Sequence, residues 1–339
     1  MIKRFFGVLG VVVLVLVIWN WSLLAYAARQ GYGQLKIVWE ARPIEEFLAD
    51  PTFPDSLKSK LQLIESIRQY AIDSLGLKDT ENYRELFDQK GEEIMWVVQA
   101  CEPFELKPKT WHFPIVGTVP YKGYFDKQLA LDERSRLEAE GFDVSVRNPG
   151  GWSTLGWFRD PILSGMLKRN EGDLASLIIH EMVHATIFVK DDVDFNENLA
   201  SFIGDTAAYY FLAAHFGRNS QQLIEYRHED QDYRKYSRHI LRGTQLLDSL
   251  YQSMSSDEPV SDKKKKKEAL IQEIMTQADT LSLHVPRKRT GGRLPNNTYF
   301  MSYHLYQARQ NNFKQELEEE FDGNLKAYIH YLTNQYPFL

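Results

Sequence analysis

Apolar residues recur at intervals of three and four along much of the chain, the spacing that places them on one face of an α-helix. The clearest such stretch runs from Leu174 to Val189, and a second runs from about Asn196 to Phe216. Residues Met95 to Phe158 are instead rich in β-branched and aromatic side chains and contain proline and glycine turns, which favours strands. The pattern therefore predicts an α+β fold that is mostly helical and has a small β-sheet.

The second half of the chain carries two long stretches of helical periodicity, at residues 220–254 and 264–278, with a short polar segment between them. We interpret residues 220–282 as a helical hairpin inserted into the domain. Five consecutive lysines, Lys263 to Lys267, stand at the start of its second helix. Contact with an anionic surface is one explanation of such a run, but a solvated helix start is the simpler one.

The N-terminal part of the chain is almost entirely apolar. Residues Phe5 to Ala28 are interrupted only by Asn20 and Ser22. A helix of this length, rising about 1.5 Å per residue, spans roughly 36 Å, which is enough to cross a bilayer. Because basic residues precede the segment, we predict that residues 1–28 form a transmembrane anchor and that the rest of the chain lies outside the cytoplasm, on the periplasmic side in a Gram-negative source.

A cleaved signal peptide is the alternative for this segment, because Ala25-Tyr26-Ala27 has the small residues of a cleavage site. The apolar run continues past Ile18, however, so we expect the segment to be retained. In either case residues 29–339 form the exported body, which we expect to be a single domain.

Composition narrows the function classes. The chain is 25% charged with a net charge of −6, so nucleic acid is not an expected partner. It contains a single cysteine, Cys101, which excludes a disulfide within the chain. The fold must therefore depend on its apolar core and on any metal ion that it binds.

One short motif within the first helical stretch carries candidate chemistry. His180-Glu181-Met182-Val183-His184 has the form H-E-x-x-H. Positions i and i+4 share a face of a helix, so both imidazoles can bind one metal ion, and Glu181 can take a proton from a water beside it. The apolar flanks predict a buried helix, where polar side chains need partners. Histidines that merely hydrogen-bond in the core are the alternative.

A third metal ligand is expected from the next helix. Twelve residues separate His184 from Glu197, which is enough for a polar loop and the start of an antiparallel helix. Two histidines and a glutamate are the ligand set of a catalytic zinc site, with a fourth position left for water. A glutamate that only stabilises the first turn of its helix is the alternative for Glu197. The predicted cofactor is Zn²⁺.

The H-E-x-x-H motif followed by Asn196-Glu197-Asn198-Leu199-Ala200 resembles the gluzincin group of zinc peptidases. The chain is also similar to a bacterial family of zinc aminopeptidases that are usually membrane-attached. The similar stretches cover most of the chain: Gly33 to Leu35, Thr110-Trp111, Phe113 to Gly117, Val119 to Phe125, Ser153 to Phe158, Asp160-Pro161, His180 to Thr186, Phe195 to Ala200 and Pro295 to Asn297. The resemblance implies a zincin-like fold, with His180, His184 and Glu197 as zinc ligands and Glu181 as the catalytic base. His112 and Thr118 replace cysteines that many relatives carry.

Further residues are candidates for binding the substrate. Because zincins commonly hold a peptide along an edge strand before the metal helix, the cleft is predicted to be lined by Thr154, Leu155, Gly156 and Trp157. A core strand with aromatic packing is the alternative. Tyr124 and Tyr121 are predicted to approach the substrate, where a tyrosine hydroxyl can donate to an oxyanion. The rival donors are Tyr299, Tyr303 and His304.

Ser201 and Asp205 lie four and eight residues after Glu197 and share its helix face. Either could accept a hydrogen bond from a ring N–H of a zinc-bound histidine. The alternative is that these polar residues simply form a solvated face of the helix.

The predicted function is a membrane-anchored zinc metallopeptidase that acts on a peptide or protein, with Glu181 as the general base. The aminopeptidase assignment follows from the family resemblance alone, and an endopeptidase is compatible with the motif. Two other functions are compatible with the chain: a non-catalytic envelope scaffold, and a zinc amidase that cleaves cell-wall peptide.

Overall fold

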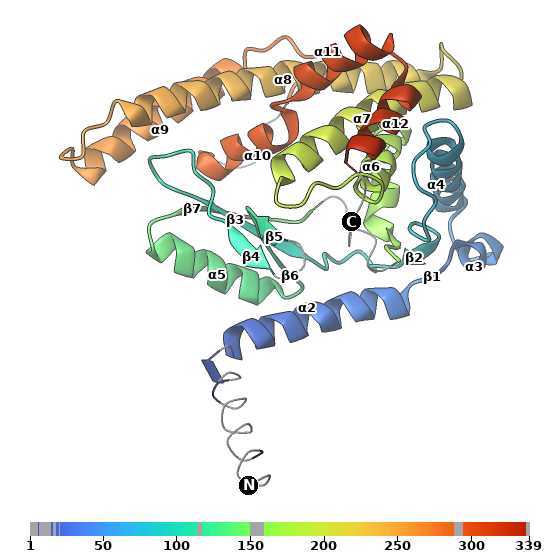
Figure 1. Cartoon of the computed structure of the whole chain (residues 1–339), viewed down its shortest axis with the longest axis horizontal. Coiled ribbons are helices and arrows are strands. Elements are labelled where there is room, and N and C mark those ends of the chain that lie inside the picture. Colours follow the sequence, from blue (N-terminus) through green and yellow to red (C-terminus); the bar gives the residue numbers. More distant parts are fainter. Residues whose placement is uncertain are drawn as a thin grey trace.

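The computed structural model describes residues 6, 15, 18–19, 21–113, 117–149, 159–287 and 294–336. Its helices, shown in Figure 1, are α2 (Trp21–Glu40), α3 (Ile44–Ala49), α4 (Asp55–Asp73), α5 (Lys127–Ala139), the 3₁₀-helix η1 (Ser164–Lys168), α6 (Glu171–His184), α7 (Val193–His215), α8 (Gln221–Gln252), α9 (Val260–Ala278), α10 (Asn297–Gln307), α11 (Gln310–Phe321) and α12 (Leu325–Gln335). The strands are β1 (Arg42–Pro43), β2 (Glu85–Phe87), β3 (Trp96–Cys101), β4 (Trp111–Phe113), β5 (Gly117–Val119), β6 (Lys122–Tyr124), β7 (Asp143–Arg147) and β8 (Ile162–Leu163). The predicted α+β class, mostly helical with little sheet, is confirmed.

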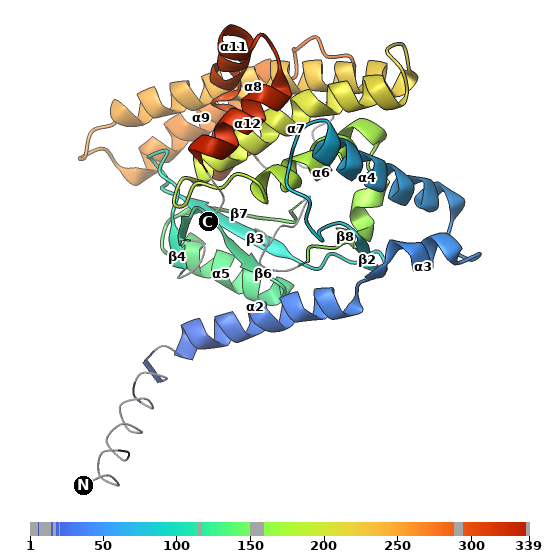
Figure 2. The ribbon, with the colours of Figure 1, turned by 45° about the vertical axis from the view of Figure 1, so that its right-hand side comes forward.

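The strands form small sheets rather than a single one. In the largest, β3 lies between β6 and β7 and pairs antiparallel with both, with Val97 opposite Gly123 and Arg147. A second sheet has the order β1-β2-β8, and β4 pairs with β5. Figures 1 and 2 show these sheets between the long helices α6 to α10 on one side and α2 and α5 on the other. Helix α5 packs on β3 and β7.

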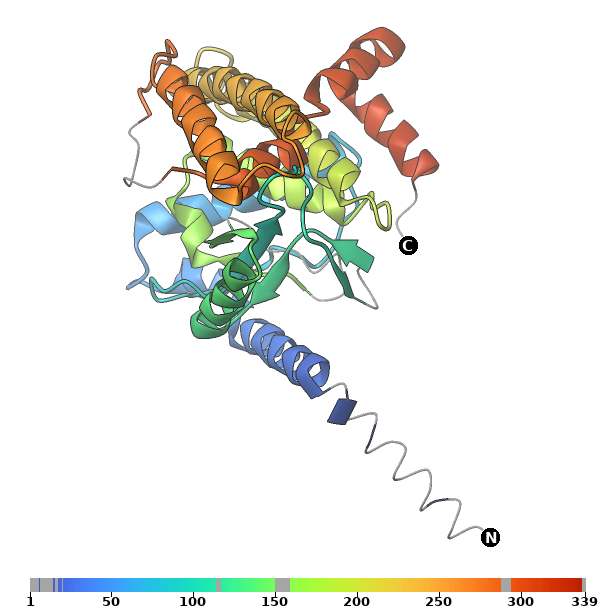
Figure 3. The ribbon, with the colours of Figure 1, turned by 90° about the vertical axis from the view of Figure 1, so that its left-hand side faces the viewer.

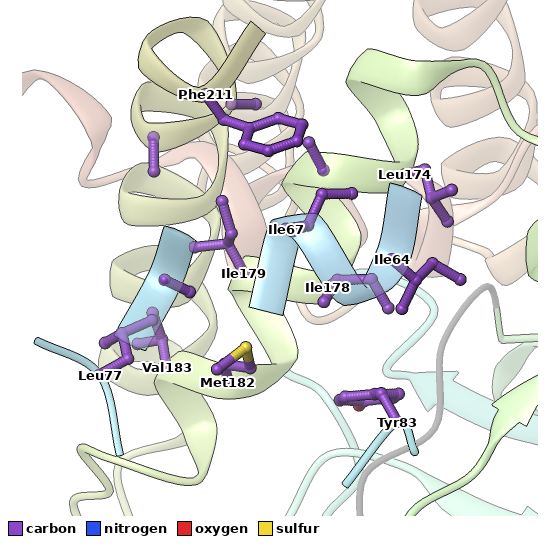
Figure 4. Packing of buried hydrophobic residues seen from close by; sticks show 14 of the residues in the cluster. Ile64, Ile67, Leu77, Tyr83, Leu174, Ile178, Ile179, Met182, Val183 and Phe211 are labelled. Carbon is purple, nitrogen blue, oxygen red and sulfur yellow. The ribbon is translucent and has the colours of Figure 1, made fainter. Parts of the chain in front are cut away.

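The main apolar core lies between α4, α6 and α7. Ile64 and Ile67 of α4, Ile178 and Ile179 of α6, and Ala207 of α7 are fully buried. Figure 4 shows the α4 and α6 side chains interdigitating, with Phe211 packed beside them. Each large aliphatic side chain buried in this way contributes about 1.5–3 kcal/mol relative to an exposed one. This core holds the H-E-x-x-H helix rigidly against its neighbours.

The predicted helical hairpin is present as α8 and α9, and it is more deeply packed than an exposed insertion. Leu223 and Tyr226 at the start of α8 belong to the main core, while Ile240, Ile274 and Phe300 build a second core between α8, α9 and α10. The C-terminal helices α11 and α12, red in Figure 3, pack side by side, and α11 also contacts α7.

The run of five lysines is not uniformly solvated. Lys264 to Lys266 are exposed, but Lys267 is 7% exposed. Its ammonium group forms an ion pair with Asp143 and donates a hydrogen bond to the carbonyl oxygen of Pro103, 2.8 Å away. The helical period places Lys267 on the same side of α9 as the buried Ile271 and Ile274, which explains why this lysine differs from its neighbours.

Half of the predicted transmembrane segment, Phe5 to Ala28, lies outside the described residues. No helix within the described part of the chain is both long enough and apolar enough to cross a membrane. The last part of the segment, from Trp21 on, belongs to α2, which continues beyond Ala28 to Glu40 and lies along the body (Figure 1). Gly33 allows this close approach, since a Cβ atom there would lie 2.2 Å from the Phe125 ring.

Candidate metal centre

Helices α6 and α7 bring the three predicted metal ligands together. His180 and His184 occupy the last two turns of α6 and project from one face, as the i, i+4 spacing predicts. Helix α7 packs closely on α6 because residue 204 is glycine. A Cβ atom at Gly204 would lie 2.7 Å from the Ser176 carbonyl oxygen and 3.2 Å from His180 Cβ.

The loop between the two helices is held by the residue that precedes Glu197. The Asn196 side chain is 4% exposed, accepts a hydrogen bond from the Val189 N–H at 2.8 Å and donates one to the Val189 carbonyl at 2.7 Å. Helix α7 begins at Val193, capped by Asp192, so Glu197 lies beyond the first turn. The explanation of Glu197 as a first-turn residue therefore loses its support, because the dipole effect is confined to that turn.

The donor atoms have the spacing of a zinc site. His180 Nε2 lies 3.1 Å from His184 Nε2, and Glu197 Oε2 lies 3.5 and 3.7 Å from these two nitrogens. Zinc bonds of about 2.0–2.2 Å at tetrahedral angles would place the donors roughly 3.4 Å apart. Within the described residues, these three form the one group of histidine, cysteine or acidic side chains arranged to hold a metal. Their chemistry and spacing fit Zn²⁺.

The charges at this centre are strongly coupled. Burial opposes ionisation of Glu197, but the charge on His184 and hydrogen bonds from both histidines outweigh it, so the pKa of Glu197 falls far below its usual range. For His184, burial lowers the pKa and the facing Glu197 more than reverses this, so the net direction is upward. The carboxylate of Glu197 is thus ionised at any working pH, as a metal ligand must be.

Glu181 lies next to this cluster but is not part of it. Its side chain is 8% exposed, and no hydrogen bond joins its carboxylate to another described residue. Burial raises its pKa above the usual glutamate value, although the two histidines partly oppose the shift. A carboxylate whose pKa is raised in this way is suited to accept and return a proton.

A cavity of about 1410 Å³ opens onto the cluster and onto Glu181. This volume exceeds the 300–1,000 Å³ typical of small-ligand pockets and suits a segment of peptide. One wall comes from α2 through Tyr26, Gln30 and Gln34. Helices α6, α7 and α8 contribute acidic side chains to the lining: Asp173, Asp205, Glu229, Asp230 and Asp232.

Two tyrosines line the same cavity as the metal cluster. Tyr121 was among the predicted oxyanion donors, and Tyr306 of α10 was not. Burial, and then the charge of Glu197, raises the pKa of both phenols, so each keeps its proton and can donate it in a hydrogen bond. Arg147 lines the cavity as well, with its Nη2 atom 3.5 Å from the Tyr306 hydroxyl. No spacing in the sequence connects these residues with the metal motif.

The other predicted donors lie elsewhere. Tyr299 and Tyr303 pack against the hairpin core, where the Tyr299 hydroxyl lies 2.8 Å from that of Tyr236. Tyr124 is 5% exposed and packs among Val98, Ala100 and Tyr26, so it lies behind the cavity wall and does not line the cavity itself. The His304 carbonyl oxygen accepts a 3.4 Å hydrogen bond from Asn198, and its ring does not line the cavity.

The remaining predicted site residues have different placements. Thr154, Leu155, Gly156 and Trp157 lie outside the described residues. Ser201 lines the cavity, and its Oγ atom lies 3.5 Å from His180 Nδ1, beside the ring nitrogen that faces away from the cluster. Asp205 accepts a hydrogen bond from the Ser176 hydroxyl at 2.7 Å rather than from a histidine, and burial raises its pKa to about 6.

Comparison with known proteins places the chain in a family. Searches of curated proteins and of solved structures found no similar chain. A family model with the description "Putative aminopeptidase" matches residues 25–335, which is nearly the whole chain and begins inside α2. The chain therefore belongs to the family described as "Putative aminopeptidase".

Proposed function

We propose that this protein is a zinc-dependent aminopeptidase. The observation that carries the proposal is the His180, His184 and Glu197 cluster, with donor spacing suited to zinc, beside the buried carboxylate of Glu181 in a cavity of peptide size. Zinc held by these residues would supply a Lewis acid that polarises the scissile carbonyl and acidifies a water molecule.

Glu181 acts as the general base and then as the general acid. Its raised pKa allows it to take a proton from the attacking water and to return it to the leaving amine. Tyr121 and Tyr306 enter the cavity with protonated hydroxyl groups, so either can donate to the oxyanion that forms at the carbonyl. Ser201 supports the orientation of the His180 ring.

Two features of the cavity favour an enzyme that acts at the amino terminus of a peptide. Strand β6 pairs with β3 on one side, while on its other side the Gly123 carbonyl oxygen accepts hydrogen bonds from Tyr26 at 2.8 Å and from Gln30 at 3.0 Å. Helix α2 thus occupies an edge along which an extended substrate would otherwise pair. The acidic side chains that line the cavity offer negative charge to the ammonium group of a substrate, although Asp230 and Asp232 already contact Arg234 and His284.

Zinc content and peptide hydrolysis by the purified full chain test the proposal. The wild type should hold about one zinc ion per chain, and His184→Ala and Glu197→Ala should each lose it or bind it much more weakly. Glu181→Gln should keep the zinc and lose hydrolysis, whereas Glu171→Gln, which changes a glutamate on the same helix that pairs with Lys60, should keep both. A wild-type chain that takes up no zinc on reconstitution would refute the metal mechanism.

Substrate screens separate the remaining alternatives. Peptides with a free amino terminus should be cleaved, and N-acetylated peptides and cell-wall fragments should not. If Glu181→Gln retains the cellular function of the wild type, a scaffold role would replace the catalytic one. For the location of the protein, we propose attachment to a membrane through the apolar segment that precedes α2, with the peptidase domain outside the cytoplasm.

A further inference from the structure

The outer face of α2 carries an exposed stripe of apolar and aromatic side chains. The stripe consists of Trp21, Leu24, Ala28, Tyr32, Leu35 and Trp39, of which Leu24 also borders the cavity. Three of its members are more than three-fifths exposed, with Trp21 at 64%, Tyr32 at 70% and Trp39 at 75%. At 3.6 residues per turn, the positions of the stripe fall within a sector of roughly 80° of the helix. The spacing repeats in threes and fours, so the stripe is continuous along the helix.

The opposite face of the same helix is the one that packs on the protein. Tyr26 and Gln30 bond to Gly123, Gly33 contacts the Phe125 ring, and Ile37 is 2% exposed in the main core. These positions lie about half a helical turn away from the stripe. Figures 1 and 2 show α2 along the outside of the body, so within the described residues the stripe has no covering layer.

Three observations identify a lipid surface as the occupant of this face. The apolar segment Phe5 to Ala28 runs directly into the stripe. The exposed rings of the stripe are tryptophan and tyrosine, the side chains that favour the boundary between headgroups and acyl chains. Arg29 and Lys36 are both exposed at one border of the stripe, where they can meet anionic headgroups.

We propose that α2 lies flat on a membrane surface, with the stripe from Trp21 to Trp39 embedded at the headgroup boundary. The inner face of α2 supplies Tyr26, Gln30 and Gln34 to the wall of the cavity. The cavity then lies about one helix diameter, roughly 10 Å, from the bilayer. The inference concerns where the protein sits, and it does not depend on the proposed hydrolysis.

Site-specific labelling of the full chain tests this placement. The native Cys101 is 1% exposed and burial raises its pKa to about 12, so it should react little with a thiol-directed fluorophore. Single cysteines are introduced as Tyr32→Cys and Leu35→Cys in the stripe. Leu246→Cys on α8, 48% exposed and across the body from α2, is the matched control. Each labelled chain is reconstituted into vesicles of phosphatidylethanolamine and phosphatidylglycerol.

Lipids brominated in their acyl chains should quench the labels at positions 32 and 35 several-fold more than the label at 246, while aqueous iodide should show the reverse order. Labels at all three positions that respond equally to iodide would overturn the proposal. Protection of positions 32 and 35 in detergent that increases with protein concentration would overturn it in favour of a second copy of the chain. Circular dichroism of each labelled chain verifies that the helices are intact, and two stripe positions guard against one substitution disturbing α2.

Discussion

The hydroxyl group of Tyr26 donates a hydrogen bond to the carbonyl oxygen of Gly123, 2.8 Å away, and thereby ties α2 to the free edge of β6. The Tyr26 ring also packs edge-on against Tyr124 and stacks on Phe113. A residue near the end of the apolar N-terminal segment is therefore part of the wall of the cavity that holds the candidate metal cluster. Cleavage after Ala27 would remove it.

A chain that starts at Ala28 should therefore be less stable than one that starts at Trp21. The loss of one hydrogen bond and of the buried part of an aromatic ring should lower the free energy of unfolding by about 1–3 kcal/mol. Urea unfolding of the two truncated chains measures the difference. Equal midpoints would show that Tyr26 is dispensable and would make signal-peptide cleavage at this site compatible with the fold.

Gly204→Ala should disturb the metal centre by changing how α7 packs on α6. The new methyl group would meet the Ser176 carbonyl and His180 Cβ, so α7 must move away from α6. We expect a destabilisation of about 1–3 kcal/mol and a zinc affinity reduced at least tenfold, because Glu197 moves with α7. Gly31→Ala is the control, since a Cβ atom there meets nothing within 4 Å. Unchanged zinc affinity in Gly204→Ala would contradict the argument.

Tyr306→Phe and Tyr121→Phe should separate catalysis from metal binding. If one of these hydroxyl groups stabilises the oxyanion, its removal should lower kcat by about 10²–10³-fold and leave zinc content unchanged. Tyr299→Phe, in the hairpin core, should leave kcat near the wild-type value. Steady-state kinetics on a chromogenic aminoacyl substrate, with zinc measured on the same samples, provides the test. Full activity in both cavity variants would assign the oxyanion contact to another group.

Asp205→Asn should change how stability depends on pH. Because burial raises the pKa of Asp205 to about 6, from 3.8, the folded state binds more protons than the unfolded state between these values. The contribution of Asp205 to the free energy of unfolding is therefore fully present below about pH 4 and is lost as the pH rises through 6. The variant should be more stable than wild type at pH 7, by up to about 3 kcal/mol, and show little difference at pH 4. Denaturant unfolding at the two pH values decides this.

Lys267→Met should lower the free energy of unfolding strongly, whereas the same substitution at an exposed lysine of the run should not. The substitution leaves the carboxylate of Asp143 without its buried cationic partner, for which a loss of about 3–5 kcal/mol is typical. The same substitution at Lys265, which is solvent-exposed, should change stability by less than about 0.5 kcal/mol. Chemical denaturation of both variants compares them directly. Similar losses of stability in the two variants would mean that the ion pair between Lys267 and Asp143 does not stabilise the fold.

Features that depend on neighbouring residues were the ones predictable from sequence. The i, i+4 spacing of His180 and His184 sets their common face, and Glu197 follows closely enough in the chain for one helix–loop–helix unit to deliver it. The helices α6 to α9 appear close to where apolar periodicity placed them. The start of α7 was predicted three residues late, because the capping Asp192 lies in a segment that reads as a polar loop.

Features that depend on distant residues were not predictable. Tyr306 and Arg147 are 159 residues apart in the chain and meet in one cavity, and neither has a periodic partner in the sequence. The same holds for Asn198, whose side chain is fully buried and bonds to the Leu305 carbonyl at 2.7 Å and the Arg309 N–H at 3.0 Å. These bonds hold α10, and with it Tyr306, against α7, the helix that carries Glu197.

The sequence by itself determined the helical framework, the paired histidines and the candidate zinc chemistry, because helical period and side-chain type are properties of a local stretch of chain. The tertiary structure alone decided which tyrosines line the cavity beside the candidate metal cluster, that Lys267 is buried while Lys265 is not, and that α2 forms a cavity wall. These outcomes depend on which surfaces pack together, and packing is settled by the summed burial of residues far apart in the chain.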